Sequence, residues 1–180
     1  MIILVDQDSV LTDFESGFLM KWRKAHPDKP YIPLEERTTF RIRENYPKEL
    51  TPLIDAVYSA PGFYRSIPLM PGGKEAIIEM QNKGHDVFIC TSPLTRFEDC
   101  VLEKYLWTEE QLGREWTKKI ILTNDKTVVI GDYLIDDNPD IKGAENPIWE
   151  HIIFDQPYNR QIKDKKRIIK WQNWREVLNI

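Results

Sequence analysis

Four short apolar stretches of the sequence are each followed by reactive polar side chains. In chain order these side chains are Asp6 and Asp8, Thr91 and Ser92, Lys126, and Asp136 and Asp137. Ligands of open α/β sheets bind just beyond the carboxyl ends of the strands. If the four stretches are strands of one parallel sheet, these groups meet at one edge, which favours an active site over four unrelated surface loops.

The residue types indicate phosphoryl transfer assisted by a metal ion. Converging carboxylates repel one another unless a cation lies among them, and oxygen ligands without a His or Cys cluster favour Mg²⁺. A carboxylate such as Asp6 can attack phosphorus and form an aspartyl phosphate. Asp8 can protonate the leaving alkoxide and then activate water. Thr91, Ser92 and Lys126 can hold the phosphoryl oxygens in the transition state.

An alternation of strands and helices must position these residues. Continuous apolar runs rich in β-branched residues, typical of strands buried in a parallel sheet, are Ile2–Val5, Asp86–Cys90, Ile120–Thr123, Val128–Asp136 and His151–Asp155. Helical patterns occur at Gly72–Gly84, Phe97–Trp107 and Ile168–Ile180. The alternation predicts an α/β fold with a doubly wound parallel sheet and helices on both of its faces.

Residues 15–68 interrupt this alternation. A helical pattern begins near Phe14, with Asp13 placed to cap it, and ends at Pro27; several prolines follow. No strand of the parallel type is evident in this stretch. The sequence therefore predicts a catalytic core formed by residues 1–14 and 69–180, with residues 15–68 as a helical insertion after the first strand.

Composition excludes several other classes of protein. A length of 180 residues suits one compact domain with a modest insertion, and a net charge of −4 argues against a nucleic-acid polymer as partner. The first apolar run is too short for a signal peptide or a membrane span. Two cysteines do not make a disulfide scaffold, so we expect a cytoplasmic protein without a membrane partner. The three histidines lack metal-ligand spacing, which predicts structural or surface roles.

The motifs DQDSVLTDF, ICTSPL, NDKT and LIDDNPD resemble, in order, the four motifs of the haloacid dehalogenase-like (HAD) superfamily. The second Asp of DxD indicates a phosphatase of that superfamily. The longer patterns DxDxVLxDFExGF, EKYxW, LTxDKT and LIDDxPDIxGAE are similar to those of the 5'(3')-deoxyribonucleotidases, over nearly the whole chain. The resemblance implies a Rossmannoid three-layer core with a parallel sheet, a small helical cap inserted after the first strand, and Mg²⁺ as cofactor.

The resemblance also assigns roles to the reactive residues. Asp6 corresponds to the nucleophile, and Asp8 to the acid and base, with its backbone carbonyl as a metal ligand. Asp137 corresponds to the remaining protein ligand of Mg²⁺, with Asp136 in support. Thr91 and Lys126 correspond to the phosphate-binding pair, and Ser92 lies beside them. The positions that face the nucleoside are Phe14, Phe40, Arg41, Ile42 and Tyr58.

Three residues depart from the family pattern. Ser9 replaces the Gly that usually follows the second Asp, which predicts a tighter turn or a shifted loop. Arg41 stands where animal relatives carry an aromatic residue, and Asn124 where Arg can occur. Arg41 and Asn124 lie where family members contact the substrate, so the sequence does not predict which base is preferred.

The resemblance implies a phosphoric monoester hydrolase for a small molecule, a deoxyribonucleoside 5'- or 3'-monophosphate. Three alternatives stay open on the residues alone. The first is a HAD phosphatase that acts on another phosphomonoester, such as a sugar phosphate. The second is a phospho-accepting, receiver-like signalling domain, which carries similar acids, a hydroxyl and a lysine. The third is a nucleotide-binding protein without catalytic activity. The order of the acidic motifs disfavours the receiver. The sequence does not specify the oligomeric state, and a homodimer is one option.

Overall fold

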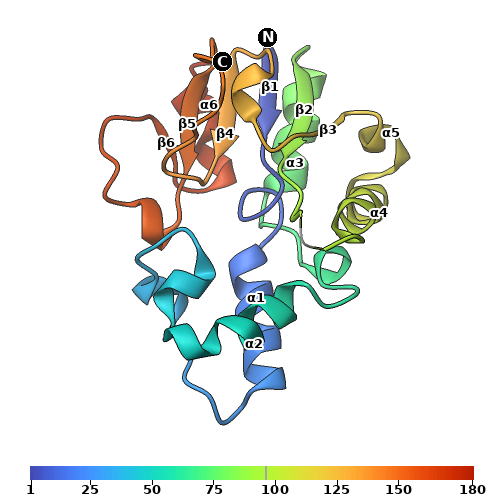
Figure 1. The fold of residues 1–180 in the computed structure, drawn as a ribbon. Helices are drawn as coiled ribbons and strands as arrows, with labels where there is room; N and C mark the ends of the chain where they lie inside the picture. The colour runs from blue at the N-terminus through green and yellow to red at the C-terminus, as the bar shows by residue number, and fades with distance from the viewer. Residues whose placement is uncertain (96) are drawn as a thin grey trace.

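A computed structural model gives the fold of residues 1–95 and 97–180. In this part of the chain a sheet of six parallel strands forms the centre, in the order β3-β2-β1-β4-β5-β6 (Figure 1). The strands are β1 (Ile2–Val5), β2 (Asp86–Thr91), β3 (Ile120–Leu122), β4 (Tyr133–Asp136), β5 (Glu150–Phe154) and β6 (Arg167–Ile168). The predicted parallel α/β core is confirmed.

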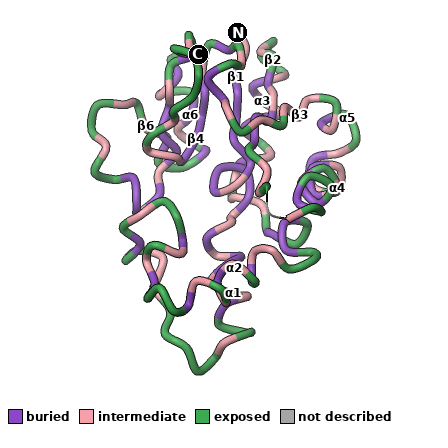
Figure 2. The backbone as a smooth tube through the Cα atoms, viewed as in Figure 1, coloured by how far each residue is buried: buried purple, intermediate pink, exposed green. Residues whose placement is uncertain are grey.

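The side chains of β1 alternate between two hydrophobic clusters, because successive residues of a strand point to opposite faces. Ile3 and Val5 are fully buried on the face covered by helices. Leu4 is fully buried on the other face, where Trp149 and residues of neighbouring loops cover it. Figure 2 shows buried residues concentrated along the central strands. Burial of both faces explains the continuous apolar runs in the sequence.

The helices of the core are α3 (Gly73–Asn82), α4 (Cys100–Leu112), α5 (Arg114–Thr117) and α6 (Trp174–Leu178). All four contribute buried side chains to the cluster that contains Ile3 and Val5. The predicted helical cover is thus found on one face of the described sheet, whereas Trp149 and loop residues cover the other face. The helix predicted over residues 72–84 is therefore confirmed to within two residues at its ends. The C-terminal helix is shorter than predicted: the 3-10 turn Trp171–Asn173 comes first, and the α-helix α6 covers only the five residues that follow.

The fourth strand is shorter than the sequence predicts. A 3-10 turn covers Lys126–Val128, and the strand begins only at Tyr133. Ile130 is 70% exposed, so the apolar stretch before the strand does not belong to the sheet. Gly131 lies so close to Leu4 that a Cβ atom would come within 2.9 Å of the Leu4 side chain, so a larger residue here would force Leu4 to move.

Residues 14–67 form a second body across the carboxyl ends of the strands, away from the two chain termini (Figure 1). Its elements are α1 (Phe14–Ala25), α2 (Thr51–Tyr58) and the 3-10 turns Leu34–Glu36, Ile42–Asn45, Lys48–Leu50 and Tyr64–Ser66. Phe18, Trp22 and Ile54 lie in a second hydrophobic cluster, which also includes Cys100 of α4. The Asp13 carboxylate accepts a hydrogen bond from Ser16 N (3.2 Å), which confirms the predicted helix cap.

Within the described chain, every helix is too short or too polar to cross a membrane.

Because His151, on β5, is largely buried, we expect the free energy of unfolding to fall in acid. Burial lowers its pKa to about 4, and the charge of Lys165, whose Nζ lies 2.9 Å from His151 Nδ1, adds to the effect. An unfolded histidine has a pKa of about 6.5, so the stabilisation is complete above pH ~6.5 and is lost as the pH falls towards ~4. At ~1.4 kcal/mol per pKa unit, the loss should not exceed roughly 3–4 kcal/mol.

Chemical denaturation of the wild type and of His151→Gln at pH 7 and pH 4.5 measures the contribution of His151 to the free energy of unfolding. We expect the free energy of unfolding to fall less in the variant than in the wild type. An equal fall in both proteins would show that another group causes the acid sensitivity.

Candidate active site

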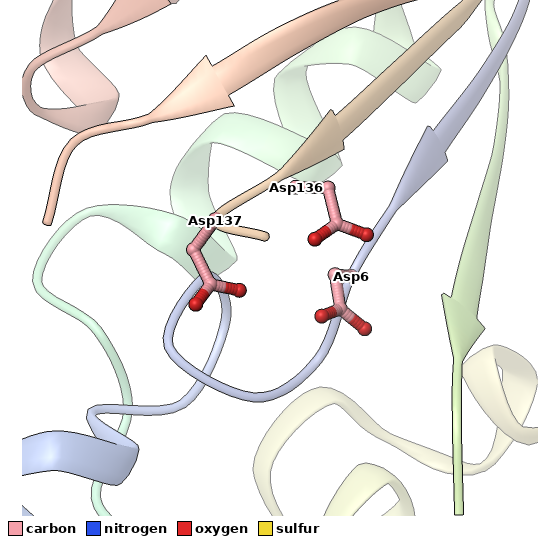
Figure 3. Close-up of side chains that lie close together, drawn as sticks. All are labelled: Asp6, Asp136 and Asp137. Atoms are coloured by element: carbon pink, nitrogen blue, oxygen red, sulfur yellow. The ribbon is translucent and has the colours of Figure 1, made fainter. Parts of the chain in front are cut away.

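Three carboxylates meet where β1 and β4 end side by side (Figure 3). Asp6 follows β1, and its N–H donates to Ile135 O (2.9 Å). Asp136 is the last residue of β4, and Asp137 follows it. All three are buried, and each offers an oxygen within 4.8 Å of the others. The parallel register of two strands thus brings together acids that are 130 residues apart in sequence, by their residue numbers.

Positive charge within this group comes from Lys126. Its Nζ lies 2.8 Å from Asp6 Oδ1 and 2.6 Å from Asp136 Oδ2. Burial lowers the pKa of Lys126, but Asp136 and Asp6 outweigh burial and raise this pKa above its ordinary value. The side chain of Asp125 accepts hydrogen bonds from Thr127 N (2.9 Å) and Ala144 N (2.8 Å), which fixes the turn that carries Lys126.

One ammonium against three carboxylates leaves excess negative charge. Burial raises the pKa of Asp137 well above its ordinary value, and the charges of Asp136 and Asp6 raise it further. Burial also raises the pKa of Asp136 to about 6, against the opposing effect of Lys126. A divalent cation would relieve this repulsion, and a donor set made only of oxygens suits a hard cation such as Mg²⁺. The residues present therefore fit the metal that the motifs imply.

The hydrogen bonds distinguish Asp136 from Asp137. Asp136 accepts from Lys126 at one oxygen and from Asn138 N (2.8 Å) at the other. Asp137 accepts from the hydroxyl of Tyr158, and its carbonyl oxygen accepts from Asn159 (2.8 Å). Both oxygens of Asp136 are thus engaged by the protein, which suits a supporting role better than direct coordination.

Asp8 is held by a lysine that sequence reasoning missed. Lys104 Nζ donates to Asp8 Oδ2 (2.6 Å) and to Thr91 Oγ1 (2.9 Å). The other carboxylate oxygen of Asp8 is buried and has no hydrogen-bond partner among the described residues. Burial raises the pKa of Asp8 above its ordinary value; Lys104 opposes this rise and Asp6 adds to it. A raised pKa suits a residue that must donate a proton.

Lys104 lies on α4 and is 1% exposed. Cys100, Trp107 and Thr108 are buried on the same helix at the spacing of one helical face. A lysine on such a face is almost never buried without a charged partner. That pattern, within the EKYxW motif, was the signal from which the sequence could have predicted its role.

Ser9 adopts the left-handed conformation (φ 59°) that normally favours Gly. The loop keeps its shape through other contacts, since Gln156 Nε2 donates to Ser9 O (2.8 Å) and both Leu11 N and Thr12 N donate to Gln7 O. Ser9 therefore meets the backbone requirement of the turn at a conformational cost, without a glycine.

The three acids, Asp8 and Lys126 line a cavity of about 670 Å³. All other predicted site residues line the same cavity: Phe14, Phe40, Arg41, Ile42, Tyr58, Thr91 and Ser92. Thr91 is buried at the end of β2, whereas Ser92, Phe40 and Arg41 are exposed. Asn124 also lies on the wall, together with Glu15 and Tyr158, which the sequence did not identify. The cavity thus combines a charged floor in the core with aromatic side chains from the segment 14–67.

A parallel α/β core with acidic residues at the ends of β1 and β4 is also the fold of solved HAD-superfamily hydrolases. The same fold occurs in YfnB of Bacillus subtilis, provisionally identified as a HAD hydrolase and solved with bound magnesium. That structure is 16% identical, with a TM-score of 0.63 over 99% of this chain and 98% of the other. At this identity the likeness shows the fold alone.

The sequence comparisons define the family more closely. The family model described as "5' nucleotidase, deoxy (Pyrimidine), cytosolic type C protein" matches residues 1–180, and the chain belongs to this family. A protein of Bordetella pertussis, provisionally named 5'(3')-deoxyribonucleotidase, is 56% identical over 99% of this chain and 95% of its own length. The human 5'(3')-deoxyribonucleotidase, cytosolic type, is 45% identical over 98% of this chain and 92% of its own.

Proposed function

We propose that the protein is a Mg²⁺-dependent phosphatase that hydrolyses deoxyribonucleoside 5'- and 3'-monophosphates through an aspartyl phosphate on Asp6. One observation carries the proposal. A buried carboxylate beside Lys126, next to a proton donor held by Lys104, shares one cavity with four aromatic side chains of the segment 14–67.

In the first step a carboxylate oxygen of Asp6 attacks phosphorus, and the bond between phosphorus and the ester oxygen breaks. Protonated Asp8 transfers its proton to the departing nucleoside oxygen, so that the leaving group is an alcohol rather than an alkoxide. Lys126 and Thr91 hold phosphoryl oxygens as negative charge moves during the transfer. The nucleoside departs and leaves a phosphoryl group on Asp6.

The second step reverses the role of Asp8. Its carboxylate, now deprotonated, removes a proton from water as the water oxygen attacks phosphorus. The bond between phosphorus and Asp6 breaks, inorganic phosphate leaves, and Asp8 is protonated for the next cycle. Asp6, Asp137 and the backbone carbonyl of Asp8 would hold Mg²⁺, with Asp136 in support. The metal supplies charge neutralisation for the phosphoryl oxygens when it is bound.

Substrate choice depends on the wall of the cavity, because the catalytic side chains at the strand ends would contact only the phosphate and the metal. Phe14, Phe40 and Tyr58 line the same cavity and offer flat apolar surface to a base. Stacking on such rings is worth ~1–3 kcal/mol per base. A ribose 2'-hydroxyl buried there without a partner would cost about 1–3 kcal/mol. Arg41 adds donors, which favours bases with carbonyl oxygens such as uracil, thymine or guanine over adenine.

The proposal includes a small-molecule substrate and a cytoplasmic location. The name of the human cytosolic-type relative supports that location, although a human mitochondrial relative is 41% identical over 98% of this chain. A homodimer stays a prediction that gel filtration with light scattering can test.

Phosphate release from a panel of nucleotides tests the function. With Mg²⁺ we expect kcat/KM for deoxyribonucleotides to exceed that for ribonucleotides by about tenfold or more, the equivalent of ~1.4 kcal/mol. EDTA should abolish release and added Mg²⁺ should restore it, because the carboxylate group needs a cation. A 4-nitrophenyl phosphate arm and a sugar phosphate arm serve as controls.

A sugar phosphate with a higher kcat/KM than every nucleotide would keep the HAD phosphatase chemistry and reject the nucleotide substrate. Full activity in EDTA would reject the metal.

A further inference from the structure

A buried arginine supports the loop that carries Phe40 and Arg41. Arg37 is 4% exposed and forms an ion pair with Glu15, which is 6% exposed and lies in the first turn of α1. A second guanidinium nitrogen of Arg37 donates to the carbonyl oxygens of Thr39 (3.0 Å) and Phe40 (3.1 Å). One side chain thus joins α1 to the backbone of the loop at two successive residues.

The loop needs such support because it has little regular structure of its own. No helix or strand covers residues 37–41, and the 3-10 turn begins at Ile42. Asn45 provides further contacts, accepting from Thr38 N (2.9 Å) and donating to the carbonyl oxygens of Thr39 and Arg41 (both 3.1 Å). Phe40 and Arg41 are exposed, so the backbone of the loop depends mainly on the hydrogen bonds of Arg37 and Asn45.

The same arginine aligns the loop with the acidic end of the cavity. Its guanidinium carbon lies 5.1 Å from the centre of the Tyr158 ring, and Phe40 packs edge-on against that ring at 5.8 Å. The hydroxyl of Tyr158 donates to the Asp137 carboxylate. A continuous set of contacts therefore runs from Glu15 through Arg37 and Tyr158 to the acids.

We propose that Arg37, held by Glu15, is the positioning residue for nucleoside recognition: it fixes residues 39–42 against Tyr158 so that Phe40 and Arg41 meet the base at a set distance from the phosphate. This inference depends on the proposed nucleotidase function. A loop ordered before binding loses less conformational freedom when substrate binds, so its rigidity adds to affinity for the nucleoside. Phosphoryl transfer itself uses neither the Arg37 side chain nor residues 39–42.

Two variants test the proposal without leaving a buried charge unpaired. Arg37→Lys keeps the ion pair with Glu15 but removes the planar group that reaches both carbonyl oxygens. The double variant Glu15→Gln/Arg37→Gln removes both charges together. We expect KM for a deoxyribonucleoside monophosphate to rise by about tenfold with kcat within about threefold, the pattern of lost ground-state binding. Hydrolysis of 4-nitrophenyl phosphate should change by less than about threefold, since it offers no nucleoside.

Arg175→Gln is the matched control, since Arg175 forms an ion pair with Glu79 and neither residue lines the cavity. It should leave both reactions unchanged, and cooperative thermal unfolding should verify that every variant is folded. A nucleotide KM that stays at the wild-type value in both variants overturns the inference. So does an equal loss of nucleotide and aryl phosphate hydrolysis, and so does a failure of both variants to fold. The proposed function has a separate test in the wild-type enzyme: no preference for nucleotides over the aryl ester would overturn the nucleotidase function. A wild type that prefers nucleotides, with an unchanged KM in the variants, would overturn only the role of Arg37.

Discussion

Asp6→Asn is expected to lower kcat by about 10⁴-fold or more on every phosphomonoester, as removal of a covalent nucleophile does. The amide keeps the size and shape of the carboxylate but cannot attack phosphorus. The position of Asp6 supports this expectation, because its oxygen lies 2.8 Å from Lys126 at the floor of the cavity. Steady-state kinetics measure kcat, and mass spectrometry of acid-quenched enzyme should detect a phosphoryl adduct in the wild type and none in the variant.

Asp86→Asn provides the control. Asp86 is an exposed carboxylate at the first residue of β2, at the opposite end of the strand from Thr91. Its substitution should leave turnover unchanged. If Asp6→Asn kept more than about a tenth of the wild-type kcat, the loss would be under ~1.4 kcal/mol, too small for a nucleophile. Asp6 would then serve the metal alone, and water would have to attack phosphorus directly.

The parallel core was predictable because a strand buried on both faces needs a continuous apolar run. Ile2–Val5 shows this pattern, and the strand has these bounds. The fourth strand shows where the pattern fails. Val128, Val129 and Ile130 look like the start of a strand, yet Val128 and Ile130 are exposed beside the close contact of Gly131 with Leu4. Short apolar runs alone do not distinguish a strand from an exposed approach to one.

The edge strand β6 was not predictable from its sequence. It contains only Arg167 and Ile168, next to a run of charged residues of the kind that usually lies on a solvated surface. Its pairing with β5 depends on tertiary contacts: Arg167 donates to Asp155 (2.8 Å) and to the carbonyl oxygen of Ile162 (2.9 Å). A two-residue strand leaves no periodicity to detect.

The site residues also fall into a set that the sequence predicts and a set that it does not. The acids and Lys126 were predictable because each follows a strand, and strand ends of a parallel sheet share one edge. Tyr158 and Arg37 were not, because each reaches its partner from an element whose position the sequence does not give. For Lys104 the sequence shows a place on a buried helical face, which indicates a charged partner, but it does not show that the partner is Asp8. Lys104 contacts Asp8 across 96 residues of chain, and Tyr158 contacts Asp137 across 21. These residues surround and orient the groups that the motifs identify.

Lys104→Met is expected to lower kcat for nucleotides by about 100-fold or more, the scale of losing one preorganised electrostatic contact. Methionine fills a similar volume but cannot donate to Asp8 or to Thr91. Without the ammonium, the Asp8 carboxylate that forms when the proton is transferred is less stable, and proton donation to the nucleoside oxygen becomes harder. The loss should therefore appear in kcat, in contrast to the KM effect expected for the Arg37 variants.

The leaving group separates this role from a general loss of structure. A nucleoside alkoxide needs a proton to depart, whereas 4-nitrophenolate is a far weaker base and needs little help. Lys104→Met should thus impair nucleotide hydrolysis at least about tenfold more than hydrolysis of 4-nitrophenyl phosphate. Lys118→Met is the control, since Lys118 is exposed and pairs with Glu115 outside the cavity. An equal loss on both substrates would mean that Lys104 acts on the phosphoryl group through Thr91, and not on the proton of Asp8.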